Sequence, residues 1–198
     1  MSLPPEEEGR ANFYALLARL FYAPADAGLL AALAQADEFD ADDEIIAARW
    51  REMAKAASSA DPAAVREEYE TAFIGTGKAP ITLYTSAYSI KYTNETPLVL
   101  LRGELAAMGL VRRDEVGEPE DHIAALCDTM RHLIATQNVG LAQQKRFFKR
   151  WIDPAAQPLC DAISQPRCSA FYEHVGRFAK AFFELERSAF EMFDAGTQ

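Results

Sequence analysis

The fold class is decided by residues 167–193, "RCSAFYEHVGRFAKAFFELERSAFEMF", the longest periodic stretch of the chain. Its large apolar residues recur at spacings of three and four. They are Phe171, Tyr172, Val175, Phe178, Phe182, Phe183 and Phe190. This spacing places them on one face of a helix. We therefore expect residues 167–193 to form the last and longest helix, with its phenylalanines in the core.

The same period recurs through most of the chain. The expected helices cover residues 13–23, 29–33, 40–57, 61–73, 96–109, 119–134 and 138–151, a segment around Pro154 and Pro158, and residues 167–193. Asp61 and Pro62 have the N-cap and first-turn residue types of a helix start. We predict an all-α fold of about nine helices with a long central aromatic loop. The expected organisation is one domain over residues 1–198, with a division into 1–110 and 111–198 as the alternative.

Composition narrows the function classes. The net charge is −10 and the pI about 4.8, so the surface repels phosphate backbones and attracts a basic peptide. Cys127, Cys160 and Cys168 are odd in number and form no C-x-x-C pair, which is typical of reduced thiols. The N-terminus lacks the pattern of a secretory signal, and the apolar runs are shorter than a membrane helix. We expect a cytoplasmic protein without nucleic-acid partners or stable membrane insertion.

The central loop begins where Gly75-Thr-Gly-Lys-Ala-Pro80 interrupts a predicted helix. These glycines lack the spacing of a phosphate loop and follow a helix, so a helix C-cap and turn is the better interpretation. Residues 81–92, "ITLYTSAYSIKY", could be a strand, but no second strand is available, and we predict an ordered loop. Loops of this length are usually functional. Tyr84, Tyr88 and Tyr92 could form a helical turn or a row of binding aromatics.

Residues 118–122, "EPEDH", raise several alternatives. Proline followed by two acids predicts a helix start with Pro119 at its first position. His122 would then lie in the first turn and stay neutral, because that end of a helix disfavours a cation. Asp121 and His122 could instead be a general base, which requires a substrate pocket and a partner group. A metal site is disfavoured because the three histidines are scattered and no Glu-x-x-His occurs.

Taken together, five stretches resemble the TorD/DmsD family, including NarJ-like proteins, of cytoplasmic chaperones for molybdenum-containing oxidoreductases. They are "RANFYALLARLFYAP" (10–24), "EEYETAFIGTGKAPITLYTSAYS" (67–89), "EPEDHI" (118–123) and the C-terminal pair "QKRFFKRWIDPAAQPLCDAI" (144–163) with "AFYEHVGRFAKAFFELE" (170–186). The resemblance covers nearly the whole chain. Thr85 stands where the family often has Glu, and Trp151 and Ala155 stand where His and Trp are common.

The resemblance implies a chaperone and not an enzyme. Such a protein binds the twin-arginine signal peptide, the apo catalytic subunit, or both, of a molybdopterin oxidoreductase of the DMSO reductase family. It holds this client for cofactor insertion and folding before export. The resemblance implies that the chain has no cofactor of its own, because the client carries the molybdopterin. It also implies that the protein is a monomer or a domain-swapped dimer. The alternative is a guanine-nucleotide-dependent maturation factor with weak GTP binding.

Within this resemblance, a peptide with two arginines and an apolar segment needs apolar walls with acids at one end. The expected signal-peptide-binding residues are Tyr69, Phe73, Tyr84, Ser86, Tyr88, Glu118, Pro119, Glu120, Asp121 and His122. Glu118, Glu120 and Asp121 would face the arginines, and His122 would bind the peptide backbone or set the loop. Glu67, Glu68 and Glu70 would add to the negative field.

Overall fold

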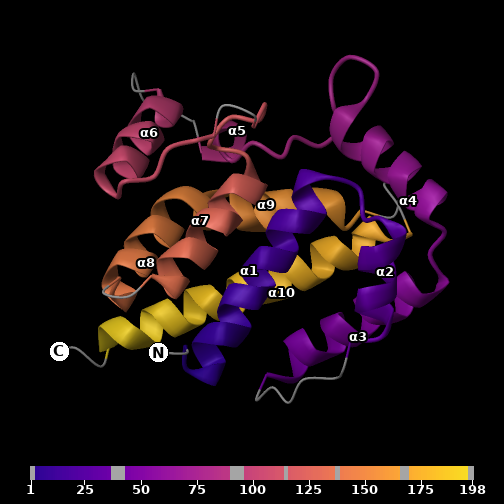
Figure 1. The fold of residues 1–198 in the computed structure, drawn as a ribbon, viewed down its shortest axis with the longest axis horizontal. Coiled ribbons are helices and arrows are strands. Elements are labelled where there is room, and N and C mark those ends of the chain that lie inside the picture. The colour runs from indigo at the N-terminus through magenta and orange to yellow at the C-terminus, as the bar shows by residue number, and fades with distance from the viewer. Residues whose placement is uncertain are drawn as a thin grey trace. The chain divides into compact units, whose positions relative to one another are not determined.

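The computed structural model describes residues 3–36, 43–89, 96–113, 116–136, 139–165 and 170–195 (Figure 1). These residues form nine continuous helical segments and no β-strand, which confirms the all-α prediction. The chain separates into two compact units, each made of two stretches. Unit 1 is Met1–Phe21 with Leu83–Ala155, and unit 2 is Tyr22–Thr82 with Ala156–Gln198. A single domain over residues 1–198 stays a prediction.

Unit 1 is built around α7 (Ile123–Ala135), whose predicted apolar face is buried. The buried residues of this helix include Ile123, Leu126, Cys127, Met130, Leu133 and Ile134. They pack against α8 (Leu141–Phe147) and the π-helical turn η2 (Phe148–Ile152), which continues into α9 (Asp153–Ile163). The unit also contains α5 (Ser86–Ser89), α6 (Pro97–Ala107) and nearly all of α1 (Pro5–Tyr22).

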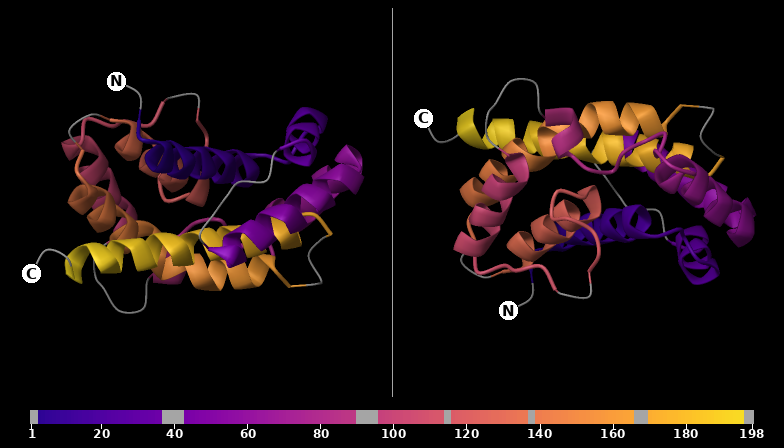
Figure 2. Two further views of the ribbon diagram at one scale, coloured as in Figure 1. Left: turned by 90° about the horizontal axis from the view of Figure 1, so that it is seen from below. Right: turned by 90° about the horizontal axis from the view of Figure 1, so that it is seen from above.

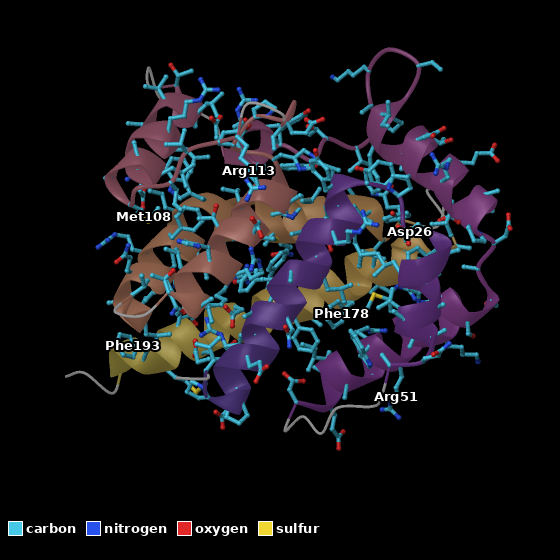
Figure 3. All side chains as sticks on the ribbon, viewed as in Figure 1. Asp26, Arg51, Met108, Arg113, Phe178 and Phe193 are labelled. Carbon is cyan, nitrogen blue, oxygen red and sulfur yellow. The ribbon has the colours of Figure 1, made fainter. Side chains whose placement is uncertain are left out.

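Unit 2 is built around α10 (Tyr172–Ala195), which packs against α3 (Glu44–Ser59) and α4 (Pro62–Tyr69), as Figure 2 shows. Unit 2 also contains α2 (Ala27–Ala34), which packs on α3, the π-helical turn η1 (Glu70–Ile74), which continues α4, and α9 from Ala156 onward. The ring centroids of Trp50 and Phe178 lie 5.5 Å apart (Figure 3 labels Phe178). The predicted apolar side of α10 therefore lies in the core of unit 2.

The N-terminus of α10 lies five residues later than predicted. Residues 166–169 are outside the described residues, and the helix itself begins at Tyr172. The Glu68 carboxylate of α4 accepts hydrogen bonds from the backbone N–H groups of Ala170 and Phe171, at 2.7 and 3.2 Å, and from that of Tyr172 at 3.4 Å. The first N–H groups of a helix have no partner within the helix, so this carboxylate caps them. Glu68 is thus a helix cap as well as an acid of the predicted negative field.

The predicted caps on either side of α4 and η1 are confirmed. The Asp61 carboxylate accepts a hydrogen bond from the backbone N–H of Ala64 at 3.0 Å, and Pro62 is the first helical residue. Gly75 ends η1 with a φ of 63°. A Cβ added there would lie 3.0 Å from the Lys78 carbonyl oxygen, so the turn requires glycine. Because the preceding segment is helix, the Gly75–Lys78 stretch is not a phosphate loop.

Two of the three cysteines can be placed. Cys127 and Cys160 are both buried, and burial raises the pKa of the Cys160 thiol well above its usual range. Such a thiol is inert at neutral pH. Cys168 lies outside the described residues. In the described part of the chain, no helix combines the length and the apolar character needed to cross a membrane.

Candidate functional site

The start of the central loop is attached by its backbone to the turn that precedes α7. Tyr84 and His122 form an isolated antiparallel bridge. The Thr85 N–H donates to the Asp121 carbonyl at 2.9 Å, and the Ile123 N–H donates to the Leu83 carbonyl at 2.8 Å. Residues 81–85 form a loop, as predicted, whereas Ser86–Ser89 form the short helix α5. The described residues contain no second strand, as expected, and the loop pairs with a turn through this single bridge. The pairing residue, His122, lies in the EPEDH motif.

Side chains reinforce this attachment. The Tyr84 hydroxyl donates to Glu118 Oε2 at 2.5 Å, and the Ser86 hydroxyl donates to Asp121 Oδ2. The Tyr84 and His122 rings meet edge to face, with their centroids 5.3 Å apart. We call Tyr84, Ser86, Glu118, Asp121 and His122 the loop cluster. It joins two segments that lie more than thirty residues apart in sequence.

The start of α7 was predicted four residues too early. Pro119 is not the first residue of a helix, because α7 begins at Ile123. The His122 N–H donates to the Pro119 carbonyl at 3.1 Å, so EPEDH forms a turn before the helix. His122 is the N-cap, and its Nδ1 accepts a hydrogen bond from the Ala124 N–H at 3.2 Å. Burial of the imidazole decides this register, since the buried nitrogen needs a donor.

His122 is only 5% exposed. Burial lowers the pKa of its imidazole, and the nearby carboxylates of Glu118 and Asp121 oppose this shift without reversing it. The ring is therefore neutral at pH 7, as predicted, although the main cause is burial. An Nδ1 that accepts a hydrogen bond places the ring proton on Nε2. The Nδ1 atom is committed to capping α7.

Asp121 is a buried member of the loop cluster, with an exposed fraction of 7%, and the neighbouring Thr85 is 2% exposed. The Thr85 hydroxyl donates to the Asp121 carbonyl at 3.2 Å, in addition to the backbone bond from the same residue. Thr85 is the position at which the resemblance leads to an expected Glu. In this chain a small hydroxyl group occupies it, and that group supports the backbone of the EPEDH turn.

Glu118 and Glu120 lie further out than Asp121. Hydrogen bonding to Glu118 and partial burial raise the pKa of Tyr84 to about 12, so the phenol stays protonated and donates. Glu120 meets two arginines of the same unit. Its Oε2 lies 2.9 Å from Arg102 Nε, and its Oε1 lies 3.6 Å from Arg112 Nε. Sequence reasoning did not identify these arginines, although Arg112 lies in the charged stretch just before the motif.

Arg112 also shapes the connection into the motif. Its Nη1 donates to the Val116 carbonyl at 2.7 Å and to the Glu118 carbonyl at 3.4 Å. The same side chain therefore holds both the backbone before EPEDH and the carboxylate of Glu120. In the predicted site, Arg112 is a positioning residue.

Two predicted site residues, Tyr69 and Phe73, belong to unit 2. They are 5% and 8% exposed, and their ring centroids lie 5.0 Å apart. Both rings also pack on Tyr172, at 5.6 and 5.3 Å. These contacts make them core residues of unit 2.

The other predicted residues belong to unit 1. Tyr88 is half-buried on α5, and its N–H donates to the Thr85 carbonyl at 3.0 Å. Its neighbour in the predicted aromatic row, Tyr92, lies outside the described residues. Glu67 and Glu70 are exposed on the α4–η1 segment of unit 2. Among the described residues, no group of three His, Cys, Asp or Glu side chains has the arrangement of a metal site.

An all-helical chain in which an ordered loop is hydrogen-bonded to an EPEDH turn has the features expected of a TorD-like maturation chaperone. The chain belongs to the family described as the nitrate reductase delta subunit, whose family model matches residues 36–184. This is a TorD-like family of molybdoenzyme maturation chaperones, so the partner is a molybdoenzyme catalytic subunit. The match includes every predicted site residue. A search of the curated proteins found no relative of the chain.

Proposed function

We propose that the chain binds the twin-arginine signal peptide, the apo catalytic subunit, or both, of a molybdopterin oxidoreductase of the DMSO reductase family. It acts in the cytoplasm and holds the client until molybdopterin is inserted and the subunit has folded, before export. This proposal makes the general maturation role of the family specific in two respects, the client class and the bound segment.

The loop cluster is the observation that carries the proposal. Recognition groups bind well when their geometry is fixed before the ligand arrives, because less conformational freedom is then lost on binding. The bonds from Tyr84 to Glu118 and from Ser86 to Asp121 fix two carboxylates in this way. A hydrophobic core requires none of these polar groups, and a hydrogen-bonded cluster of carboxylates, hydroxyls and an imidazole on a loop is typical of a functional site.

The outer carboxylates fit a guanidinium ligand. A carboxylate has about four acceptor positions on its two oxygens. Glu118 uses one oxygen for the Tyr84 hydroxyl, and Glu120 already faces guanidinium groups. Charge-assisted hydrogen bonds of this kind contribute roughly 1.5–3 kcal/mol when desolvated. The net charge of −10 adds a longer-range attraction for a basic peptide.

For Asp121 we propose a different role from the one expected from sequence, and for His122 we keep the expected alternative in which it sets the loop. Asp121 and His122 are held inside the cluster by Ser86 and by the N-terminus of α7. We assign them to positioning, and we assign contact with the peptide arginines to Glu118 and Glu120. Substitution of Asp121 or His122 then weakens peptide binding through the shape of the loop.

Two exposed valines supply apolar surface beside these groups. Val99 is 62% exposed on α6, one turn before Arg102, and Val111 is 86% exposed and precedes Arg112. Both arginines face Glu120. The apolar segment that follows the arginine pair of a signal peptide would contact this surface.

Co-purification with a client tests the proposal. The chain would be mixed with the apo catalytic subunit of the molybdoenzyme encoded beside it, with and without the subunit's signal peptide, and analysed by size-exclusion chromatography. The proposal expects a complex with the apo subunit that dissociates when molybdopterin has been inserted. Retention of the fully loaded subunit, or failure to bind either apo form, would contradict it.

A further inference from the structure

Glu120 already binds guanidinium groups in the free chain. Its side chain is 13% exposed, whereas those of Arg102 and Arg112 are 50% and 38% exposed. The anion therefore lies mostly inside, and the two cations reach it from the solvent side. This is the arrangement that an arginine pair of a bound peptide would make with the same carboxylate.

We propose that Arg102 is an internal competitor that occupies Glu120 until a peptide arginine replaces it. The inference rests on the proposed function and adds a regulatory contact to it. Peptide binding is then an exchange of one guanidinium for another and not the filling of an empty site. The contact lowers the affinity for single basic side chains, and a peptide with a second arginine and an apolar segment overcomes it.

The two arginines differ in how firmly they are held. Arg112 has additional hydrogen bonds to the Val116 and Glu118 carbonyls, so it stays in place. In the described part of the chain, Arg102 is held by Glu120, and half of its side chain is in solvent. It can leave without burying an unpaired charge, because water solvates the released guanidinium. Glu120 is largely buried and needs a cation in its place.

Exchange is favourable only if the internal pair is weak. Partly exposed ion pairs are typically worth little, because solvent screens them and holding both side chains costs entropy. Removing Arg102 should therefore tighten binding of a twin-arginine peptide by roughly 1.5- to 5-fold. A peptide with two lysines should gain less, because an ammonium group cannot reproduce the fork geometry of guanidinium on a carboxylate.

Titration calorimetry of Arg102→Gln with a synthetic twin-arginine signal peptide tests the exchange. The matched control is Arg131→Gln, which changes the net charge equally and removes a surface pair with Asp128 on α7 of the same unit. The expected result is tighter binding by Arg102→Gln than by Arg131→Gln. In a Glu120→Gln background, Arg102→Gln should have no effect, because the coupling acts through that carboxylate.

The outcomes separate this inference from the proposed function. If the wild type prefers the twin-arginine peptide but Arg102→Gln binds no better than Arg131→Gln, the exchange is overturned and the function stands. Weaker binding by Arg102→Gln also overturns it, since Arg102 would then be a contact for the peptide. If the wild type binds neither the twin-arginine nor the twin-lysine peptide, the exchange and the signal-peptide part of the proposed function are both overturned. Binding of the apo subunit is then decided by the co-purification experiment.

Discussion

The Ser86 hydroxyl donates a hydrogen bond to the Asp121 carboxylate, and this bond ties the first residue of α5 to the turn before α7. Asp121 is 7% exposed, so its carboxylate depends on protein donors and not on water. The position of the central loop is thus coupled to the register of α7.

Loss of the Ser86 hydroxyl should destabilise the protein. In Ser86→Ala the buried Asp121 carboxylate loses a donor, and we expect the free energy of unfolding to fall by about 1–3 kcal/mol. Urea unfolding followed by circular dichroism measures this change. Ser188→Ala is the control, because its hydroxyl bonds a backbone carbonyl on an exposed helix face. Equal midpoints for the two variants would show that the Ser86 bond contributes no stability.

Tyr84 should ionise late. Its folded pKa is raised to about 12 from an ordinary value of 10.0 by the hydrogen bond to Glu118 and by burial. Because the folded pKa is raised, the stabilisation from the Tyr84–Glu118 hydrogen bond is complete below the unfolded pKa. It is lost as pH rises through the folded pKa. An ultraviolet phenolate titration of the wild type minus that of Tyr84→Phe should show one tyrosine ionising near pH 12. Glu118→Gln should move it toward 10. A difference curve centred at 10 in the wild type would remove the Tyr84–Glu118 bond from the account.

His122 should make the protein sensitive to mild acid. Burial lowers the pKa of its imidazole in the folded state. The unfolded chain therefore binds the proton more readily, and stability is lost as pH falls through the ordinary imidazole pKa of 6.5 towards the lower folded pKa. His122→Asn keeps an acceptor for the Ala124 N–H but cannot titrate. Thermal unfolding between pH 7 and 5 should show a smaller loss of Tm in this variant than in the wild type.

The control for this prediction is His132→Asn, which removes an exposed imidazole from the last turn of α7. It should keep the acid sensitivity of the wild type. If His122→Asn loses as much Tm as His132→Asn over the same pH range, His122 is not the group responsible.

Gly75 should resist substitution. At its φ of 63° a Cβ strains the backbone, and it would also lie 3.0 Å from the Lys78 carbonyl oxygen. Gly75→Ala should cost about 1–2 kcal/mol of unfolding free energy. Gly103→Ala is the matched control, because Gly103 lies inside α6 and an added Cβ would meet no atom within 4 Å. We expect it to add about 0.5–1 kcal/mol. Chemical denaturation of both variants checks the pair, and a stable Gly75→Ala would contradict the turn geometry.

Local periodicity was sufficient to predict the helices, but their ends depend on distant groups. The phenylalanines of α10 are buried as their spacing predicted, because a stripe at helical spacing can only be covered by packing. The start of this helix was predicted too early, since its cap, Glu68, lies about a hundred residues away in sequence. Nothing in the sequence around Tyr172 indicates that contact.

In the candidate site, too, the local motifs could be predicted from sequence, whereas the contacts between distant residues could not. The EPEDH motif and the aromatic loop were identified from sequence, but Pro119 was assigned to the wrong place because its neighbours have the residue types of a helix start. The burial of His122, which sets the register, is a tertiary property. Arg102 was missed because it meets Glu120 only when α6 and the turn come together. Tyr69 and Phe73 were read as binding aromatics, although their helical spacing is equally typical of the core in which they lie.

The most direct test of the central claim is titration calorimetry of the wild-type chain with the twin-arginine signal peptide of the neighbouring molybdoenzyme, beside a twin-lysine version. The account predicts micromolar or tighter binding of the first peptide, weaker binding of the second, and loss of the difference in Glu118→Gln and Glu120→Gln. Equal binding of both peptides by the wild type, or a preference that survives both substitutions, would contradict the assignment of these carboxylates to the arginine pair.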